Sequence, residues 1–195
     1  MRRTQSSSCN SNLTSTNSAN YSTSLSAETG TNNSAIVNIT SSQEADNTGM
    51  YTVLEVAKWF LNKSPMTHKK LQKLCYYAQA WSYALNNRRL IDSDFQAWVH
   101  GPVSPALYEF FKPFGYNTIC MKGSYSSQID PKDEALLEDV WETYGDHDGN
   151  SLEALSHREA PWINARQGYL PHERCTVVID PESMREYYKA IYVGE

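Results

Sequence analysis

The chain has 195 residues, a formal net charge of −5 and a hydrophobic content of 40%. This length fits one globular domain together with a further segment. The acidic balance excludes the strongly basic surface of a general nucleic-acid binder, so we expect nucleic acid to be an unlikely partner.

Residues 1–49 form a low-complexity segment of small polar side chains. Of these 49 residues, 12 are Ser, 8 are Thr and 8 are Asn. Such a segment has too little apolar surface to offset the conformational entropy that it would lose on folding. We therefore predict a disordered tail over residues 1–49 and a folded domain over residues 50–195, which is long enough to bury its own hydrophobic core.

The sequence carries no recognisable signal for export or membrane insertion. The first three residues resemble the start of a signal peptide, but only Ser- and Asn-rich sequence follows them. No run approaches the roughly 18 apolar residues of a membrane span. The four cysteines lack a Cys-x-x-Cys spacing, which favours reduced thiols. We therefore expect a cytoplasmic protein that has no membrane partner.

The folded sequence begins with a signal for the start of a helix. Thr52 and Glu55 have the spacing of a capping box, in which each side chain accepts a hydrogen bond from the other residue's backbone N–H. Apolar residues continue at helical spacing to Leu61, and Asn62–Pro65 ends the pattern. We predict the first helix between these two signals.

The stretch Thr67–Leu85 predicts a helix that is buried on almost every side. One stripe follows the i, i+3, i+4, i+7 spacing and consists of Leu71, Leu74, Cys75, Ala78, Ser82 and Leu85. The opposite side carries Tyr76, Ala80 and Tyr83, with Lys73 among them. Because a helix that is apolar all round is usually buried, we predict that the other helices pack around this one.

The segment after this helix alternates between extended and helical signals. Phe95–His100 is short and aromatic, which predicts a strand that Gly101-Pro102 ends. Ser104-Pro105 is an N-cap followed by proline at the first helical position, so a helix should begin there. We expect Thr118–Met121 to pair with Phe95–His100 as a small β-hairpin.

The C-terminal half contains four further helix starts and one extended segment. The starts are Asp130-Pro131, Asn150 with Glu153, Pro161-Trp162 and Asp180-Pro181, and Thr176–Ile179 is extended. The last helix carries its apolar residues at Met184, Tyr187, Tyr188 and Ile191. The sequence therefore predicts a mainly α protein: a single compact helical domain of about seven helices around a central buried helix, with a small β-hairpin.

The sequence offers little support for catalysis. The five histidines have no metal-ligand spacing, and no nucleophile elbow or phosphate-binding glycine loop is present, so we expect no enzyme, metal or cofactor. The remaining enzymatic hypothesis is a general base at His157 with Glu159 as its carboxylate partner. A histidine that satisfies backbone groups near a helix end is the favoured interpretation.

Three lysines near the start of the central helix are candidates for binding a partner. Lys69, Lys70 and Lys73 lie close to the positive end of the helix dipole, an unfavourable position for a cation. An acidic partner would offset this cost, although solvated side chains are the favoured interpretation for Lys69 and Lys70. Lys73 lies among aromatic residues, so it must reach either water or a carboxylate. The possible carboxylates are those of Asp92, Asp94 and Glu109.

Three blocks of the sequence together resemble the Panacea domain family, also described as SocA-like antitoxin or phage-associated GepA-type proteins. The blocks are THKKLQKLCYYAQAWSYAL, FQAWVHGPVSPALYEFFKPFG and LEALSHREAPWINAR. The residues that carry the resemblance are Leu71, Gln72, Lys73, Leu74, Tyr76, Tyr77, Gln79, Trp98, Gly101, Pro102, Val103, His157, Pro161 and Trp162.

The resemblance implies a helical antitoxin that neutralises a cognate toxin protein by direct binding. It also implies an alternative, a proteolytic adaptor that delivers the bound toxin to a ClpXP-type protease. The family brings no catalytic residues with it, so the signature residues are expected to form scaffold. The cognate toxin is expected from the adjacent gene.

Overall fold

The computed structural model describes residues 50–120 and 128–193, so the tail predicted over residues 1–49 lies outside the described residues. The described ranges contain seven α-helices, one 3₁₀-helix and four short strands. In chain order these are α1 (Val53–Lys63), β1 (Met66–Thr67), α2 (His68–Asn86), β2 (Gln96–Trp98), β3 (Gly101–Val103), α3 (Pro105–Phe111), η1 (Lys112–Phe114), β4 (Thr118–Ile119), α4 (Pro131–Tyr144), α5 (Gly149–Ser156), α6 (Ala160–Ala165) and α7 (Pro181–Val193).

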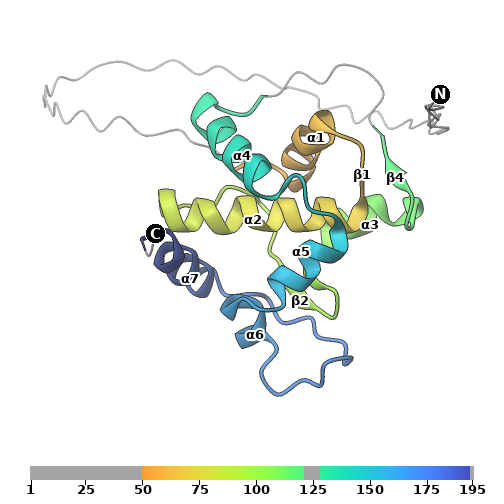
Figure 1. Ribbon diagram of the computed structural model, residues 1–195, viewed down its shortest axis with the longest axis vertical. Helices are drawn as coiled ribbons and strands as arrows, with labels where there is room; N and C mark the ends of the chain where they lie inside the picture. The colour runs from red at the N-terminus through yellow and green to blue at the C-terminus, as the bar shows by residue number, and fades with distance from the viewer. Residues whose placement is uncertain (1–49, 121–127, 194–195) are drawn as a thin grey trace, which may run out of the picture. The chain divides into compact units, whose positions relative to one another are not determined.

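The central position of α2 is confirmed. It packs against α1, α3, α4, α5 and α7 and against β1 and β3. In Figure 1, α2 crosses the middle of the described helices, with α1 and α4 on one side and α7 on the other. Twelve of its residues are buried, from His68 to Ser82. None of the helices in the described ranges is long and apolar enough to cross a membrane.

The predicted helix starts are confirmed with one exception. Thr52 and Glu55 form the expected capping box, and the helices that begin with proline start where the sequence indicated. The exception is α5, which is capped by Asp148 rather than Asn150. The Asp148 side chain accepts a hydrogen bond from the backbone N–H of Ser151 at 2.7 Å. Asp and Asn cap helices equally well, so sequence alone could not choose between the two positions.

The small β-hairpin is confirmed, but the predicted pairing is wrong. β2 pairs antiparallel with β3, and Trp98 stands opposite Gly101. The segment Gly101–Val103, expected to break the strand, therefore forms the second strand of the hairpin. Thr118–Ile119 pairs instead with Met66–Thr67. Both sheets have only two strands, so proline is tolerated because its missing N–H can face away from the partner strand.

The segment Thr176–Ile179 is extended, as predicted. The backbone N–H of Ile179 donates to the carbonyl of Phe95 at 2.8 Å, and the N–H of Ala97 donates to the carbonyl of Val177 at 2.9 Å. These bonds fix the chain between α6 and α7 along β2.

The expectation of reduced thiols is confirmed for two of the described cysteines. Cys75 and Cys175 are free and buried. Burial raises the pKa of the Cys75 thiol, which keeps it in the neutral form. The expectation is wrong for Cys120, which is disulfide-bonded.

Candidate functional site

The signature residue Gln72 fixes the start of α3. Its side-chain amide forms two hydrogen bonds with the backbone of Ser104: Ser104 N–H donates to Gln72 Oε1 at 2.9 Å, and Gln72 Nε2 donates to the Ser104 carbonyl at 3.1 Å. Ser104 is in turn the N-cap of α3. The amide is buried and holds two elements together, so its role is structural.

Lys73 is buried in the interior, with 1% of its surface exposed. Its Nζ donates a hydrogen bond to the carbonyl of Pro102 at 3.1 Å, whereas the three predicted carboxylates, those of Asp92, Asp94 and Glu109, bond to other groups. The prediction for this lysine was wrong because the β2–β3 hairpin brings a backbone carbonyl closer than any acidic side chain. Burial lowers the pKa of Lys73 to about 7, against an opposing effect of the Glu153 carboxylate.

The signature glycine Gly101 makes room for Lys73. It has a φ of 92°, a conformation that residues with a side chain rarely adopt. A Cβ atom at this position would lie 2.6 Å from Lys73 Cε and 2.8 Å from Ser156 Oγ. The glycine therefore permits both the turn and the close approach of the buried lysine.

The carboxylate of Glu159 belongs to a cluster of aromatic side chains. It accepts hydrogen bonds from the hydroxyl of Tyr188 at 2.7 Å and from that of Tyr77 at 3.3 Å. The Tyr77 ring is stacked on that of Tyr144, with 4.0 Å between the ring centroids. Burial raises the pKa of Glu159, while the two hydroxyls lower it. These contacts join α2, α4, α6 and α7.

His157 does not face Glu159 as a general base would face its partner. Its ring is stacked on Trp162 with 4.0 Å between centroids, and Trp162 Nε1 donates to the carbonyl of Trp98 at 3.0 Å. Burial lowers the pKa of His157, and the carboxylate that opposes this effect is that of Glu153. The structure thus separates the two residues of the enzymatic hypothesis into different packing contacts.

The other two lysine candidates are held within the chain. Lys69 forms an ion pair with Glu153 and donates to Asn150 Oδ1 at 2.9 Å. Lys70 donates to the carbonyl of Gly145, and its ammonium lies 5.3 Å from the centre of the Trp141 ring. Lys69 therefore ties the first turn of α2 to α5, and Lys70 ties it to the end of α4. The role of both lysines in binding a partner stays a prediction.

Sequence reasoning missed two buried polar centres. The Arg166 guanidinium donates to the carbonyls of Ala97, Leu170 and Glu173 at 2.8, 2.9 and 2.8 Å, which fixes the loop after α6. The buried Asp133 pairs with Arg88 and accepts a hydrogen bond from the Tyr51 hydroxyl at 2.9 Å. The only signal for Arg166 was its place at the end of the third block. Nothing in the sequence marked Asp133.

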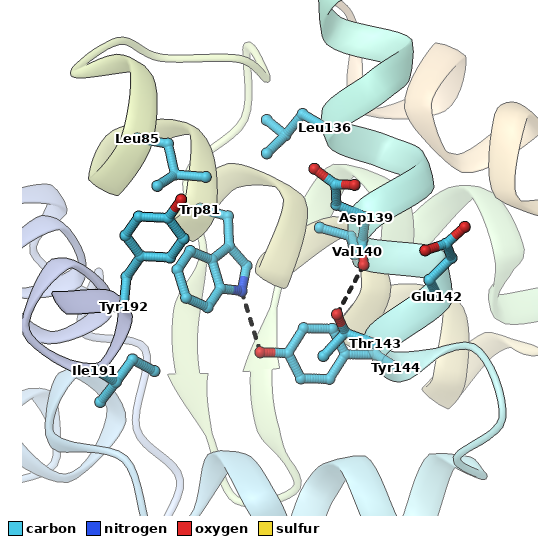
Figure 2. A pocket seen from close by; sticks show the side chains of 10 residues that line it. All are labelled: Trp81, Leu85, Leu136, Asp139, Val140, Glu142, Thr143, Tyr144, Ile191 and Tyr192. Atoms are coloured by element: carbon cyan, nitrogen blue, oxygen red, sulfur yellow. Dashed lines mark hydrogen bonds between the residues drawn. The ribbon is translucent and has the colours of Figure 1, made fainter. Parts of the chain in front are cut away.

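An open groove lies where the C-terminal end of α2 meets α4 and α7 (Figure 2). Its volume is about 470 Å³. The residues that line it are Trp81, Leu85, Leu136, Asp139, Val140, Glu142, Thr143, Tyr144, Ile191 and Tyr192. We refer to this set as the α2–α4–α7 groove.

The floor of the groove is fixed, whereas its apolar rim is exposed. Trp81 Nε1 donates to the hydroxyl of Tyr144 at 3.1 Å, as Figure 2 shows. At the rim, Leu85 and Ile191 are each 42% exposed and Tyr192 is 60% exposed. The sequence placed Leu85 on the apolar stripe of a buried helix, and this assignment is wrong. Adjacent exposed apolar side chains of this kind are typical of surfaces that bind another molecule.

A second cavity, of about 570 Å³, lies beside the first turn of α2. Lys69, Lys70 and the segment Asp146–Asn150 line it. Its two lysines are already paired inside the chain, and its lining is more polar than that of the groove. The α2–α4–α7 groove is therefore the stronger candidate for a protein-binding surface.

The architecture is that of a mainly helical domain in which Gln72 and Lys73 are buried and hydrogen-bonded and one apolar groove is open. Residues 71–163 match the family model described as Antitoxin SocA-like, Panacea domain, the family that the sequence blocks resemble. It is also similar to Antitoxin SocA of Caulobacter vibrioides (strain NA1000 / CB15N), with 30% identity over 124 residues. That alignment covers 55% of this chain and 66% of the relative, just under two thirds of its length. No solved structure gave a significant match.

Proposed function

We propose that this chain is a non-enzymatic antitoxin that neutralises a toxin protein by binding it directly. The observation that carries the proposal is the match of residues 71–163 to an antitoxin family, supported by a relative that is itself an antitoxin. The structure is consistent with a binding role, because the signature residues hold helices together and leave the α2–α4–α7 groove exposed.

The proposal includes where and with what the chain acts. The partner is a cognate toxin encoded by the adjacent gene, and the two proteins meet in the cytoplasm. Binding would neutralise the toxin by covering the surface that it needs for its own activity. In the alternative, the chain is an adaptor that also delivers the bound toxin to a ClpXP-type protease.

Co-expression tests the proposal. The product of the adjacent gene is induced in cells with and without the full chain, and colony formation and complex formation by affinity capture are measured. We expect the chain to restore growth and to co-purify with that product. A chain with Leu74→Asp, which places a charge in the core, serves as the unfolded control. Failure of the wild-type chain both to rescue growth and to form a complex would rule the function out.

The lifetime of the partner separates simple binding from the adaptor mechanism. The half-life of the toxin is measured after translation is stopped, with and without the chain, in cells that contain or lack ClpX. Direct neutralisation predicts a half-life that the chain leaves unchanged or lengthens. A half-life that the chain shortens only when ClpX is present would establish the adaptor mechanism instead.

A further inference from the structure

We propose that the α2–α4–α7 groove receives an amphipathic helix of the toxin that carries Lys or Arg beside its apolar side. The inference rests on the proposed function and adds the surface and the chemistry of the partner segment. Three properties of the groove support it: its exposed apolar rim, its unpaired carboxylates and its construction from helices alone.

The apolar side of the partner helix would contact side chains that are now exposed. Leu85 comes from α2, and Ile191 and Tyr192 come from α7, so one surface collects residues that are far apart in the sequence (Figure 2). The Tyr192 ring lies 6.2 Å from Trp81, whose indole is already held by a hydrogen bond. A rim of this kind above a fixed floor gives a partner's apolar side chains a shaped surface to bury.

The carboxylates of the rim favour a basic partner. Asp139 and Glu142 lie on α4, are exposed, and form none of the ion pairs found among the described residues. Among the residues that the structure describes, no Lys or Arg lines the groove. A partner with Lys or Arg at this edge would pair with both carboxylates and would be steered toward the groove.

The same charges argue against two other occupants. A second copy bound through the same face would bring the carboxylates of Asp139 and Glu142 close to their own counterparts. The segment over residues 1–49 contains two arginines and three acidic residues, so it does not supply the required positive charge. A basic segment of another protein is the occupant that the charges favour.

The construction of the groove favours a helix over a strand. All ten lining residues belong to α2, α4 or α7, so the groove offers no strand edge to which an extended peptide could add. Binding between helices instead uses apolar side chains spaced at i, i+3, i+4 and i+7. The 14 residues of α4 span roughly 21 Å, which is enough for three to four turns of a partner helix.

Two pairs of matched variants test the inference with the purified full chain and the product of the adjacent gene in an inactive form. Ile191→Asp places a charge in the groove, and Ile163→Asp on α6 is its control because the two isoleucines are 42% and 45% exposed. We expect Ile191→Asp to raise the Kd of the complex by at least about 30-fold, as for an apolar contact residue that the partner buries. Ile163→Asp should change it by less than about 2-fold.

The second pair reverses charge. Asp139→Lys combined with Glu142→Lys should raise the Kd by about 10-fold or more, and the loss should shrink at high salt. The control is Asp94→Lys with Glu109→Lys, which makes the same change in net charge at exposed surface ion pairs outside the groove. This control should leave the Kd within about 3-fold of the wild-type value.

A photo-crosslinking amino acid in place of Tyr192 identifies the occupant. We expect it to capture a toxin peptide with apolar residues at helical spacing and at least one Lys or Arg. Capture of a second copy, of residues 1–49 or of an acidic peptide would overturn the inference. The inference would also be overturned if the wild-type chain forms a complex and both groove variants bind with unchanged Kd. That result would not contradict the proposed function. A wild-type chain that forms no complex would instead overturn the proposed function and this inference with it.

Discussion

The two ends of α2 meet very different surroundings. From Leu71 to Ser82 nearly every side chain is buried, and some of the polar ones are bonded to backbone groups, as Gln72 is to Ser104 and Lys73 to Pro102. One turn later, Leu85 is 42% exposed at the edge of the α2–α4–α7 groove. A single helix therefore serves as the core of the domain along most of its length and as part of an open surface at its end.

This difference follows from the surroundings of the side chains at the two ends of the helix. Buried polar side chains accept few alternative arrangements, because an unpaired polar group in the interior is costly. The hydrogen bonds of Gln72 and Lys73 therefore fix the position of α3 and of the β2–β3 hairpin relative to α2. The exposed C-terminal end of α2 has no such constraint, so its side chains can be substituted with little effect on the stability of the fold.

The largest effect is expected from the same substitution made at the two ends of α2. Leu74→Ala removes a fully buried side chain and should lower the free energy of unfolding by about 2–5 kcal/mol, because a cavity is left in the core. Leu85→Ala should cost less than about 1 kcal/mol, because its side chain already meets solvent. Urea denaturation of both variants measures this, and equal losses would contradict the contrast between the two ends.

An effect of intermediate size is expected from the buried ammonium of Lys73. Burial lowers its pKa in the folded state to about 7, whereas the unfolded chain keeps the ordinary value near 10.5. Between pH 7 and 9 the unfolded state then binds more protons, so the free energy of unfolding should rise with pH, by about 2 kcal/mol in total. Above that range, the raised pKa values of buried tyrosines such as Tyr144 begin to oppose the rise.

Lys73→Met is the control for this pH dependence. It removes the titrating group, so denaturation curves recorded from pH 7 to 9 should show a much flatter stability profile than those of the wild-type chain. A wild-type profile that is already flat, or a variant that keeps the rise, would show that the ammonium does not titrate in this range.

A smaller effect is expected at the start of α2. Lys69→Glu with Lys70→Glu breaks the ion pair with Glu153 and the contact with Gly145, and it places like charges together. We expect a loss of about 1–2 kcal/mol in the free energy of unfolding. Lys132→Glu with Lys189→Glu makes the same change in charge at exposed positions and should cost less than about 0.5 kcal/mol. Equal thermal stability of the two double variants would mean that Lys69 and Lys70 are not part of the scaffold.

Local signals predicted the elements well and their contacts less well. Thr52, Asp130-Pro131 and Asp180-Pro181 marked helix starts because capping depends on a few neighbouring atoms. The partner of β2 depends on how α2 and α3 hold the chain, so the sequence chose the wrong strand. The spacing of apolar residues along α2 also did not reveal that Leu85 is exposed, because its exposure depends on how α4 and α7 pack beside it.

The candidate site was predictable only in part. The resemblance to the Panacea family came from residues that include Gln72, which is hydrogen-bonded to the backbone of Ser104, and Gly101, where a Cβ atom would collide with Lys73. No sequence pattern singled out Asp139 and Glu142, since their place beside the apolar ends of α2 and α7 exists only in the folded chain. Binding surfaces built from distant segments leave no compact motif in a sequence.

Amide hydrogen exchange on the wild-type chain, with and without the product of the adjacent gene, tests the central claim most directly. The account predicts slower exchange at residues 81–86, 136–144 and 187–193 on binding, with little change in α5 and α6. Protection confined to α5, α6 or the first turn of α2, with the groove segments unchanged in a complex that forms, would contradict the account.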